Sequence, residues 1–385
     1  MEDSHAQHVR TARREAKGLS LVPRFLQVNT FYPDYLADFY AARPHLQDAP
    51  YDAQMNALLD DEFSGTHIWT RVLTAHGFET LNVISNNPYS QRAWLREHGY
   101  PVGEKVDVAY TTLRQIHDFA PDVFYTNDVV TFHTGFFNAV EKRPPVVAGW
   151  RGFPLPATSD LSAYDLILTS FDRMFVEAKT KGAKRVERFH PGFPDSSPVL
   201  REPREMKYDV VISGSVTPQH LRRIQLIDMI AAMSQETPGF SLGLFTARAQ
   251  PLSPLAQSMN NGARWGLEML RTIRNGRILV NIDVDAFDGQ PPNMRLIEAT
   301  GAGAFLLTTH HPELASFFEP GEEIETFRTP QELAAKISYY LTMPERADDI
   351  ARRGQQRCMR EHAHSVRAGW FASIMRDALR EQQCA

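Results

Sequence analysis

Short apolar segments alternate with amphipathic segments along the first half of the chain. Apolar runs of strand length occupy five segments: 24–31, 80–87, 122–128, 144–152 and 164–171. Apolar positions recur at helical spacing in three others: 61–79, 93–99 and 111–121. Ser64 is the expected N-cap of the first helix. Because strands that alternate with helices form parallel sheets, this half predicts a five-stranded α/β domain.

The same alternation starts again after a segment, 189–209, that is dense in Pro and Ser and has no periodicity. Strands are expected at 209–215, 240–246, 277–283 and 304–309, and helices at 220–233, 267–276, 293–303, 330–344 and 346–382. The pattern predicts an α/β protein with two Rossmann-like, doubly wound parallel-sheet domains facing a central cleft. We expect residues 1–195 to form the first domain and 205–366 the second, and 367–385 to form a helix that returns to the first.

Composition narrows the classes of protein that this chain represents. A length of 385 residues exceeds what one hydrophobic core usually holds, and no apolar run is long enough to span a bilayer. The amino terminus lacks the apolar centre of a signal peptide, so a cytoplasmic location is expected, with Cys358 and Cys384 reduced. A net charge of -5 gives no electrostatic footprint for duplex nucleic acid.

Ligands of doubly wound domains bind at the carboxyl ends of the strands, so the loops that follow strands carry the candidate site. After the strand at 209–215, Gly214 and Ser215 lead into a helix start near Gln219 that is suited to an anion. Arg222 and Arg223 add donors, although arginines on a first turn are often only solvated. This turn alone is weak support for a ligand site.

The stretch "NMRLIEATGAG" is more specific, because it follows an irregular loop and begins a second helix. Asn293, Met294 and Arg295 start this helix, and a second anion-binding turn beside the first suits a diphosphate. Glu298 is placed to accept hydrogen bonds from the two hydroxyls of a ribose. A diphosphate with a ribose diol is a nucleotide. The alternative is that Glu298 is a surface residue paired with Arg295.

The last quarter of the chain resembles a known family. It contains Arg-x-x-Glu-Ala, a turn of small residues, an apolar Leu-Thr strand, Pro-Glu-Leu, Phe-x-x-Gly-x-Glu, a helix ending in Tyr-Tyr-Leu and Gly-x-x-Arg, followed by His364 and Arg367. This pattern resembles the spore-maturation-protein (CgeB-like) glycosyltransferases, which have the GT-B fold. The resemblance implies a transferase that takes a sugar from a nucleotide-sugar donor to an acceptor hydroxyl without an obligatory metal or other cofactor.

The resemblance also implies roles for single residues. Glu298 matches the second Glu of the Glu-x7-Glu signature of retaining GT-B enzymes, whereas Gln290 replaces the first, so the stereochemical outcome stays open. Trp265, with Arg264 beside it, stands at a strand-to-helix turn where this fold usually holds the nucleobase; the alternative is that its ring only packs there. Asp283 and Asp285 have the spacing of a metal-binding Asp-x-Asp motif, but that motif belongs to another glycosyltransferase fold. We therefore interpret them as loop acids.

In the first half, three residues are candidates for chemistry on the acceptor: His67, near the start of the helix expected over 61–79, and His133 and Arg151, at strand ends. His67 is a candidate base, His133 follows a strand, and Arg151 is placed to stabilise charge on a leaving diphosphate. A histidine satisfied on a helix face is the alternative for His67. The expected partners are a nucleotide sugar and an acceptor of unidentified class. A nucleotide-sugar epimerase of the same architecture and a non-catalytic sugar-nucleotide-binding or scaffold protein are the alternative functions.

Overall fold

The structure is a computed structural model, and it describes residues 22–283 and 294–384. The chain divides into two compact units, whose boundaries do not follow the sequence order. Unit 1 contains the chain up to Asp60, His67–His190 and the segment from Ala368 onward, and unit 2 contains Asp61–Thr66 and Pro191–Arg367. A six-residue piece of the first half of the chain therefore belongs to the second unit.

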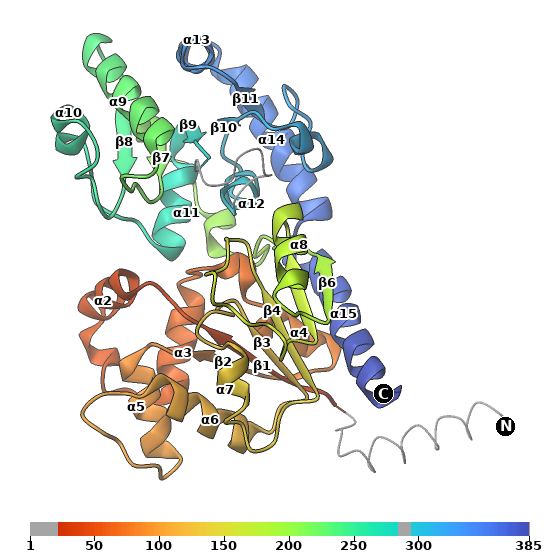
Figure 1. Cartoon of the computed structure of the whole chain (residues 1–385). Coiled ribbons are helices and arrows are strands. Elements are labelled where there is room, and N and C mark those ends of the chain that lie inside the picture. Colours follow the sequence, from red (N-terminus) through yellow and green to blue (C-terminus); the bar gives the residue numbers. More distant parts are fainter. Residues whose placement is uncertain (1–21, 284–293, 385) are drawn as a thin grey trace. The chain divides into compact units, whose positions relative to one another are not determined.

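Unit 1 is built on a parallel sheet of six strands, in the order β2-β1-β3-β4-β5-β6 (Figure 1). Its strands are β1 Arg24–Asn29, β2 Glu79–Ile84, β3 Val123–Thr126, β4 Val146–Trp150, β5 Leu166–Thr169 and β6 Arg185–Arg188. Its helices are α2 Pro33–Ala42, α3 Tyr51–Asp60, α4 Thr70–Leu73, α5 Pro88–Glu97, α6 Val108–Phe119, α7 Thr134–Phe137 and α8 Asp172–Thr180. The sequence pattern predicted five strands in this half and missed β6.

The core of unit 1 includes the end of the chain. Helix α15, His364–Cys384, places Phe371, Ile374 and Leu379 in one cluster with buried side chains of β1, β3, β4 and β5. The Phe371 ring stacks on Trp69, with ring centroids 4.7 Å apart and an interplanar angle of 10°. Trp370, on the other hand, is 59% exposed. The apolar side of this helix is therefore buried in unit 1, although the helix begins in unit 2.

Unit 2 contains a parallel sheet of five strands, in the order β11-β10-β9-β7-β8 (Figure 1). Its strands are β7 Tyr208–Ser213, β8 Leu242–Phe245, β9 Gly276–Asn281, β10 Leu306–Thr309 and β11 Glu325–Phe327. Its helices are α9 Leu221–Glu236, α10 Pro254–Ser258, α11 Gly266–Arg274, α12 Arg295–Gly301, α13 Pro330–Thr342 and α14 Pro344–Glu361. Helix α9 begins at Leu221, two residues after Gln219, near which the sequence predicted its start.

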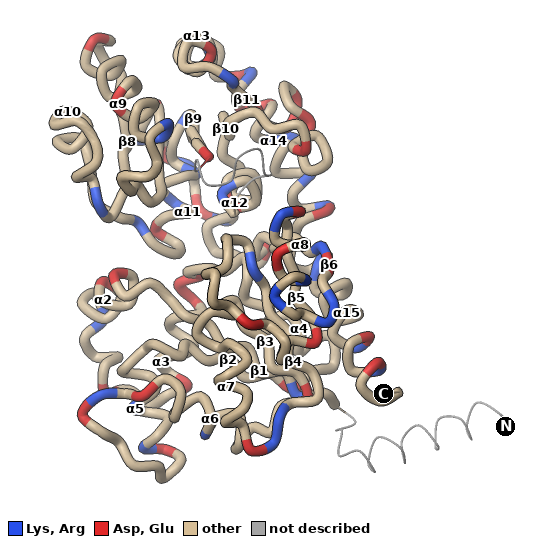
Figure 2. Tube along the Cα trace, in the orientation of Figure 1, with Lys and Arg blue, Asp and Glu red and all other residues tan. Residues whose placement is uncertain are grey.

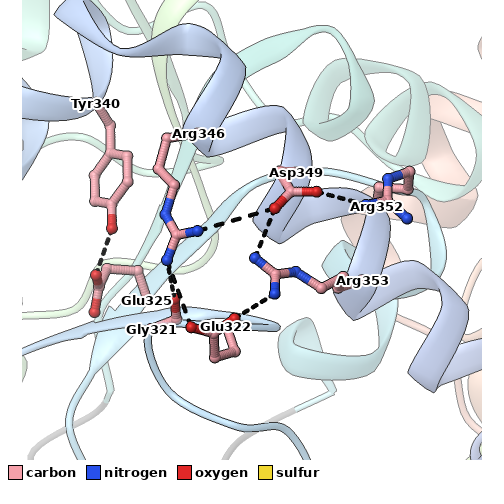
Figure 3. A network of polar contacts seen from close by, with 8 residues as sticks. All are labelled: Gly321, Glu322, Glu325, Tyr340, Arg346, Asp349, Arg352 and Arg353. Carbon is pink, nitrogen blue, oxygen red and sulfur yellow. Dashed lines mark hydrogen bonds and ion pairs between the residues drawn. The ribbon is translucent and has the colours of Figure 1, made fainter.

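Ion pairs hold the connection between β10 and β11 against helix α14, as Figure 3 shows. Arg346 donates to the Gly321 carbonyl at 3.2 Å and lies 3.5 Å from a Glu322 carboxylate oxygen. Arg353 binds both Glu322 and Asp349. Acidic and basic residues are spread over the helices of both units in the same mixed way (Figure 2). The ion pairs of Arg346 and Arg353 are exposed and contribute little to stability, and their effect is to hold the loop against α14.

The helix expected over 61–79 is replaced by several short pieces. The chain forms a 3-10 turn at Gly65–His67, then α4, then a 3-10 turn at Thr74–His76. Ser64 has a φ of 57° and Glu62 a φ of 55°, both in the left-handed region, so Ser64 does not cap a helix. The apolar periodicity was real, but residues 61–66 fold against unit 2 instead.

Candidate functional site

The strand order of unit 2 places a topological switch point at β7. The chain leaves β7 toward β8 on one side and returns to β9 on the other, which is the order at which doubly wound sheets bind ligands. The carboxyl ends of β7 and β9 are continued by Gly214 and Ile282. These ends define the candidate site in unit 2.

A buried arginine fixes the two chain segments at this switch point. Arg223 is 9% exposed, and its guanidinium donates to the carbonyl of Ser215 at 2.7 Å and to the carbonyl of Ile282 at 3.0 Å. Gly214 adopts a φ of +152°, which L side chains rarely take. Arg223 therefore braces the loop from inside, whereas the neighbouring Arg222 is exposed and donates to the Arg328 carbonyl at 3.0 Å.

Asp283 follows β9 at the same edge of the sheet. Its backbone N–H donates to Thr309 Oγ1 at 3.3 Å, which ties it to the end of β10. Burial raises the pKa of the Asp283 carboxyl to about 6, and the charges of Arg223 and Arg222 act in the opposite direction. Asp285, Gln290 and Asn293 lie outside the described residues.

Helix α12 brings together two of the predicted nucleotide-binding residues. Glu298 Oε2 lies 2.9 Å from Arg295 Nη1, and both side chains are mostly buried, with 11% and 14% exposed. The pair is therefore not the exposed surface pair that the alternative interpretation assumed. Arg295 is the single polar partner of the Glu298 carboxylate among the residues that the structure describes. Met294 precedes the helix, and its sulfur accepts a hydrogen bond from Thr66 Oγ1 at 3.3 Å.

Trp265 lies at the N-cap position of helix α11, which has no side-chain cap. Its ring meets the ring of Phe63 edge to face, with centroids 5.8 Å apart and an interplanar angle of 77°. Arg264 lies over the Phe245 ring and donates to the Asn261 carbonyl at 3.1 Å. Both residues thus follow the end of β8, on the side of the switch point opposite β9.

In unit 1 the three predicted acceptor-side residues have different surroundings. His67 is buried, its carbonyl accepts from Gln27 Nε2 at 2.7 Å, and its ring lies 4.2 Å from the Trp150 ring. Arg151 follows Trp150 and donates to the carbonyls of Phe153 and Pro154 at 2.6 and 2.8 Å. Burial lowers the pKa of this guanidinium, against the charges of Asp128 and Glu177.

His133 has a structural role that the sequence did not predict. It is exposed, and its Nδ1 accepts a hydrogen bond from the Gly135 N–H at 3.0 Å, which caps α7. A histidine whose ring nitrogen caps a four-residue helix is a weaker candidate for acid-base chemistry than His67. The Gly135 N–H fixes Nδ1 as an acceptor, which leaves Nε2 to carry the proton of the neutral ring.

The sequence analysis missed a polar cluster at the switch point of unit 1, where β1 lies between β2 and β3. Thr30 Oγ1 donates to Asp128 Oδ2 at 2.6 Å and lies 3.3 Å from Ser85 Oγ. Each of these residues comes just after a strand, and the sequence "TND" at the end of β3 carried that signal. This cluster joins His67 and Arg151 as a candidate for contact with the acceptor.

Within residues 22–283 and 294–384, no group of three or more His, Cys, Asp or Glu side chains is placed to hold a metal ion. No helix there has the length and apolar character needed to cross a bilayer. Cys358 is buried and Cys384 exposed, and neither forms a disulfide.

Comparison with solved structures gives the class of fold. A glycosyltransferase from Rickettsia africae matches with a TM-score of 0.56 and 9% identity, over 94% of this chain and 100% of that chain. HepE from Anabaena, solved in complex with UDP, matches at 0.54 and 13%, over 92% and 100%. Sucrose-phosphate synthase from Thermosynechococcus elongatus matches at 0.54 and 12%, over 93% and 100%. The predicted GT-B fold, with two Rossmann-like sheets, is confirmed.

Part of the second half of the chain matches a protein family. Residues 222–372 match the family described as glycosyl transferase-like. No curated protein matches the sequence significantly. The matched region contains α9, α11, α12 and the carboxyl edge of the unit 2 sheet. A glycosyl transferase-like sequence on a GT-B fold supports the glycosyltransferase that the sequence analysis predicted.

Proposed function

We propose that this glycosyltransferase transfers a sugar from a nucleoside-diphosphate sugar to an acceptor hydroxyl, without a metal ion, and that it belongs to the CgeB-like group. The bond between the sugar C1 and the diphosphate oxygen breaks, and a bond forms between C1 and the acceptor oxygen. The acceptor proton passes to a base on the protein, and the nucleoside diphosphate leaves.

The buried carboxylate of Glu298 is the observation that carries the proposal. One of its oxygens pairs with Arg295 at 2.9 Å, and among the described residues the other has no polar partner. An ionised carboxylate that is held by one arginine keeps a second oxygen that can accept hydrogen bonds from donors on a ligand. The vicinal hydroxyls of a ribose are such donors, and Arg295 holds the carboxylate in position for them.

The diphosphate is proposed to bind where the chain leaves β7. Gly214 and Ser215 form a turn that Arg223 braces, and this turn precedes the start of α9. The backbone N–H groups at a helix start, with the nearby positive charge of Arg222, stabilise negative charge as the sugar departs. These groups are the reason to propose metal independence.

For the acceptor side we propose His67 as the base and Arg151 as a stabiliser of charge, with Asp128 nearby. His67 is buried beside Trp150, and the Asp128 carboxylate lies near enough to Arg151 to oppose the lowering of its pKa. A neutral imidazole is suited to take a proton from a hydroxyl near pH 7.

The test is calorimetric binding of UDP, GDP, TDP, CDP and ADP to the parent protein and to Glu298→Gln. For the nucleotide that binds best, affinity should fall by about one to two orders of magnitude, because a hydrogen bond to a charged group contributes about 1.5 to 3 kcal/mol. The 2'-deoxy form of that nucleotide should bind the parent poorly and discriminate much less in the variant.

The matched control is Glu361→Gln, which removes the charge of another Glu paired with an arginine, Arg357, on helix α14. It should leave the affinity unchanged. Because the Glu298 pair is mostly buried, Glu298→Gln also lowers the free energy of unfolding, so binding is compared below the melting temperature of both proteins. Equal affinity of Glu298→Gln and the parent would show that Glu298 only pairs with Arg295. Turnover of the sugar nucleotide without any acceptor would favour an epimerase.

A further inference from the structure

The segment Asp61–Thr66 is a strap, a short piece of the first half of the chain that packs on unit 2. The residues on both sides of it, Asp60 and His67, belong to unit 1. The Asp61 carbonyl accepts a hydrogen bond from the Leu267 N–H at 2.7 Å, at the start of α11. The Thr66 carbonyl accepts from the Gly192 N–H at 3.2 Å and lies 3.3 Å from His364 Nε2. The strap is thus fixed to unit 2 at both of its ends.

The backbone of the strap is strained, and its partner is shaped to receive it. Glu62 and Ser64 both have positive φ values, 55° and 57°, which cost energy for residues with a Cβ. On α11, a Cβ added to Gly266 would lie 2.1 Å from the Asp61 carbonyl oxygen, so only glycine allows this approach. Strain of this kind persists only where the surrounding contacts determine the conformation.

The strap contacts two of the residues that the sequence predicted to bind the nucleotide. The ring of Phe63 meets the ring of Trp265 edge to face at 5.8 Å. Thr66, which is buried, donates through its hydroxyl to the sulfur of Met294, just before α12. The two contacts fall at the starts of α11 and α12. A role for the strap would explain why its strained backbone is kept: it would hold the predicted ligand-binding residues at the starts of α11 and α12 in position.

We propose that the strap is part of the donor site and that Phe63 is a positioning residue, which holds the Trp265 ring in the orientation that receives the nucleobase. This inference rests on the proposed function, because it takes Trp265 as the contact of the base. Phe63 acts through Trp265 and therefore affects the base and not the diphosphate. Loss of the Phe63 ring frees Trp265 to turn, and the base then loses its preorganised contact.

The experiment compares the nucleoside diphosphate that binds best, chosen from UDP, GDP, TDP, CDP and ADP, with inorganic pyrophosphate, both by calorimetry. Phe63→Ala should weaken nucleotide binding about 3- to 10-fold, the range expected for one aromatic pair, and leave pyrophosphate binding unchanged. Phe63→Tyr keeps the ring and should bind like the parent. Tyr339→Ala removes an aromatic ring from another edge-to-face pair of unit 2, with Tyr340, and should change neither affinity.

Two results would overturn the inference while the proposed function stands. In the first, Phe63→Ala binds the nucleotide as tightly as the parent. In the second, it loses nucleotide and pyrophosphate affinity by the same factor, which would show a general effect on folding of the site. If the parent protein binds none of the five nucleotides, the proposed function itself fails, and the inference fails with it.

Discussion

Acid should destabilise this protein through two buried histidines at the junction of α14 and α15. Burial lowers the pKa of both His362 and His364 to about 4, from an ordinary value of about 6.5. His362 Nδ1 accepts from Arg367 Nη2 at 2.7 Å, so a proton on that nitrogen would break the bond and place two cations side by side. His364 is 4% exposed, beside Gly192 and Thr66. Both rings are therefore neutral in the folded protein near neutral pH.

The sign of the effect follows from which state binds more protons. Between pH 6.5 and 4 the unfolded chain protonates both histidines and the folded protein protonates neither, so stability is lost as the pH falls. Asp283 acts in the opposite sense. Its folded pKa, about 6, is raised, so the folded protein holds a proton that the unfolded chain has released between pH 6 and about 4. The unfolded chain therefore binds two more protons than the folded protein between pH 6.5 and 6, and one more between pH 6 and about 4.

The magnitude follows from about 1.4 kcal/mol for each pH unit and proton. From pH 7 to pH 4.5, each histidine lowers the free energy of unfolding by about 2.7 kcal/mol, and Asp283 raises it by about 2 kcal/mol. The net loss is about 3 kcal/mol. Urea unfolding at 25 °C, followed by circular dichroism at several pH values, measures it, and the loss falls on the transition of unit 2 if the units unfold separately.

The variant that tests the reasoning carries both His362→Gln and His364→Gln, because neither glutamine titrates. Its free energy of unfolding should be lower than that of the parent at pH 7, but it should not fall further between pH 7 and 4.5. The Asp283 effect remains, and the lowered pKa of His310 opposes it, so a rise of less than about 2 kcal/mol is expected on acidification. A parent protein whose stability changes by less than about 1 kcal/mol over this range would refute the argument, as would a variant that loses as much as the parent.

Two further predictions concern catalysis and the core. Turnover of the donor should survive excess EDTA, and a loss of activity that manganese restores, together with inactivity of Asp283→Ala, would reverse the proposal of metal independence. Phe371→Ala should lower the free energy of unfolding of unit 1 by about 3 to 5 kcal/mol in urea, because its ring is fully buried against Trp69. Its exposed neighbour offers the control, since Trp370→Ala should cost less than about 1 kcal/mol, and equal losses for the two variants would contradict the packing argument.

The fold was predictable because most strands are apolar and are separated by amphipathic helices. The strands β6 and β11 escaped prediction for a physical reason. The first, "RVER", has a single apolar residue and lies at the sheet edge, and the second, "ETF", has three residues. Neither segment therefore forms an apolar run. The resemblance to a family could be recognised in the half of the chain predicted to bind the nucleotide, because its motif residues lie close together in sequence around α12.

The candidate site was predictable in part. Arg295 and Glu298 were found because they lie on one helix turn, but their burial depends on packing that spacing does not show. The strap was predicted as a helix, because the periodicity of 61–79 takes no account of positive φ angles or of a partner elsewhere in the chain. Asp128 and Thr30 are 98 positions apart and meet only through the order of the strands.

The division of the chain into units has a consequence for engineering. The chain passes from one unit to the other at 60/61, 66/67, 190/191 and 367/368. A single cut in the Pro-rich connection would give a carboxyl-terminal fragment without the strap, and an amino-terminal fragment without Phe371 and the other core residues of α15. The halves are therefore not interchangeable modules. A chimera made to accept another donor has to transplant residues 61–66 together with unit 2, and has to keep the last 18 residues of the recipient.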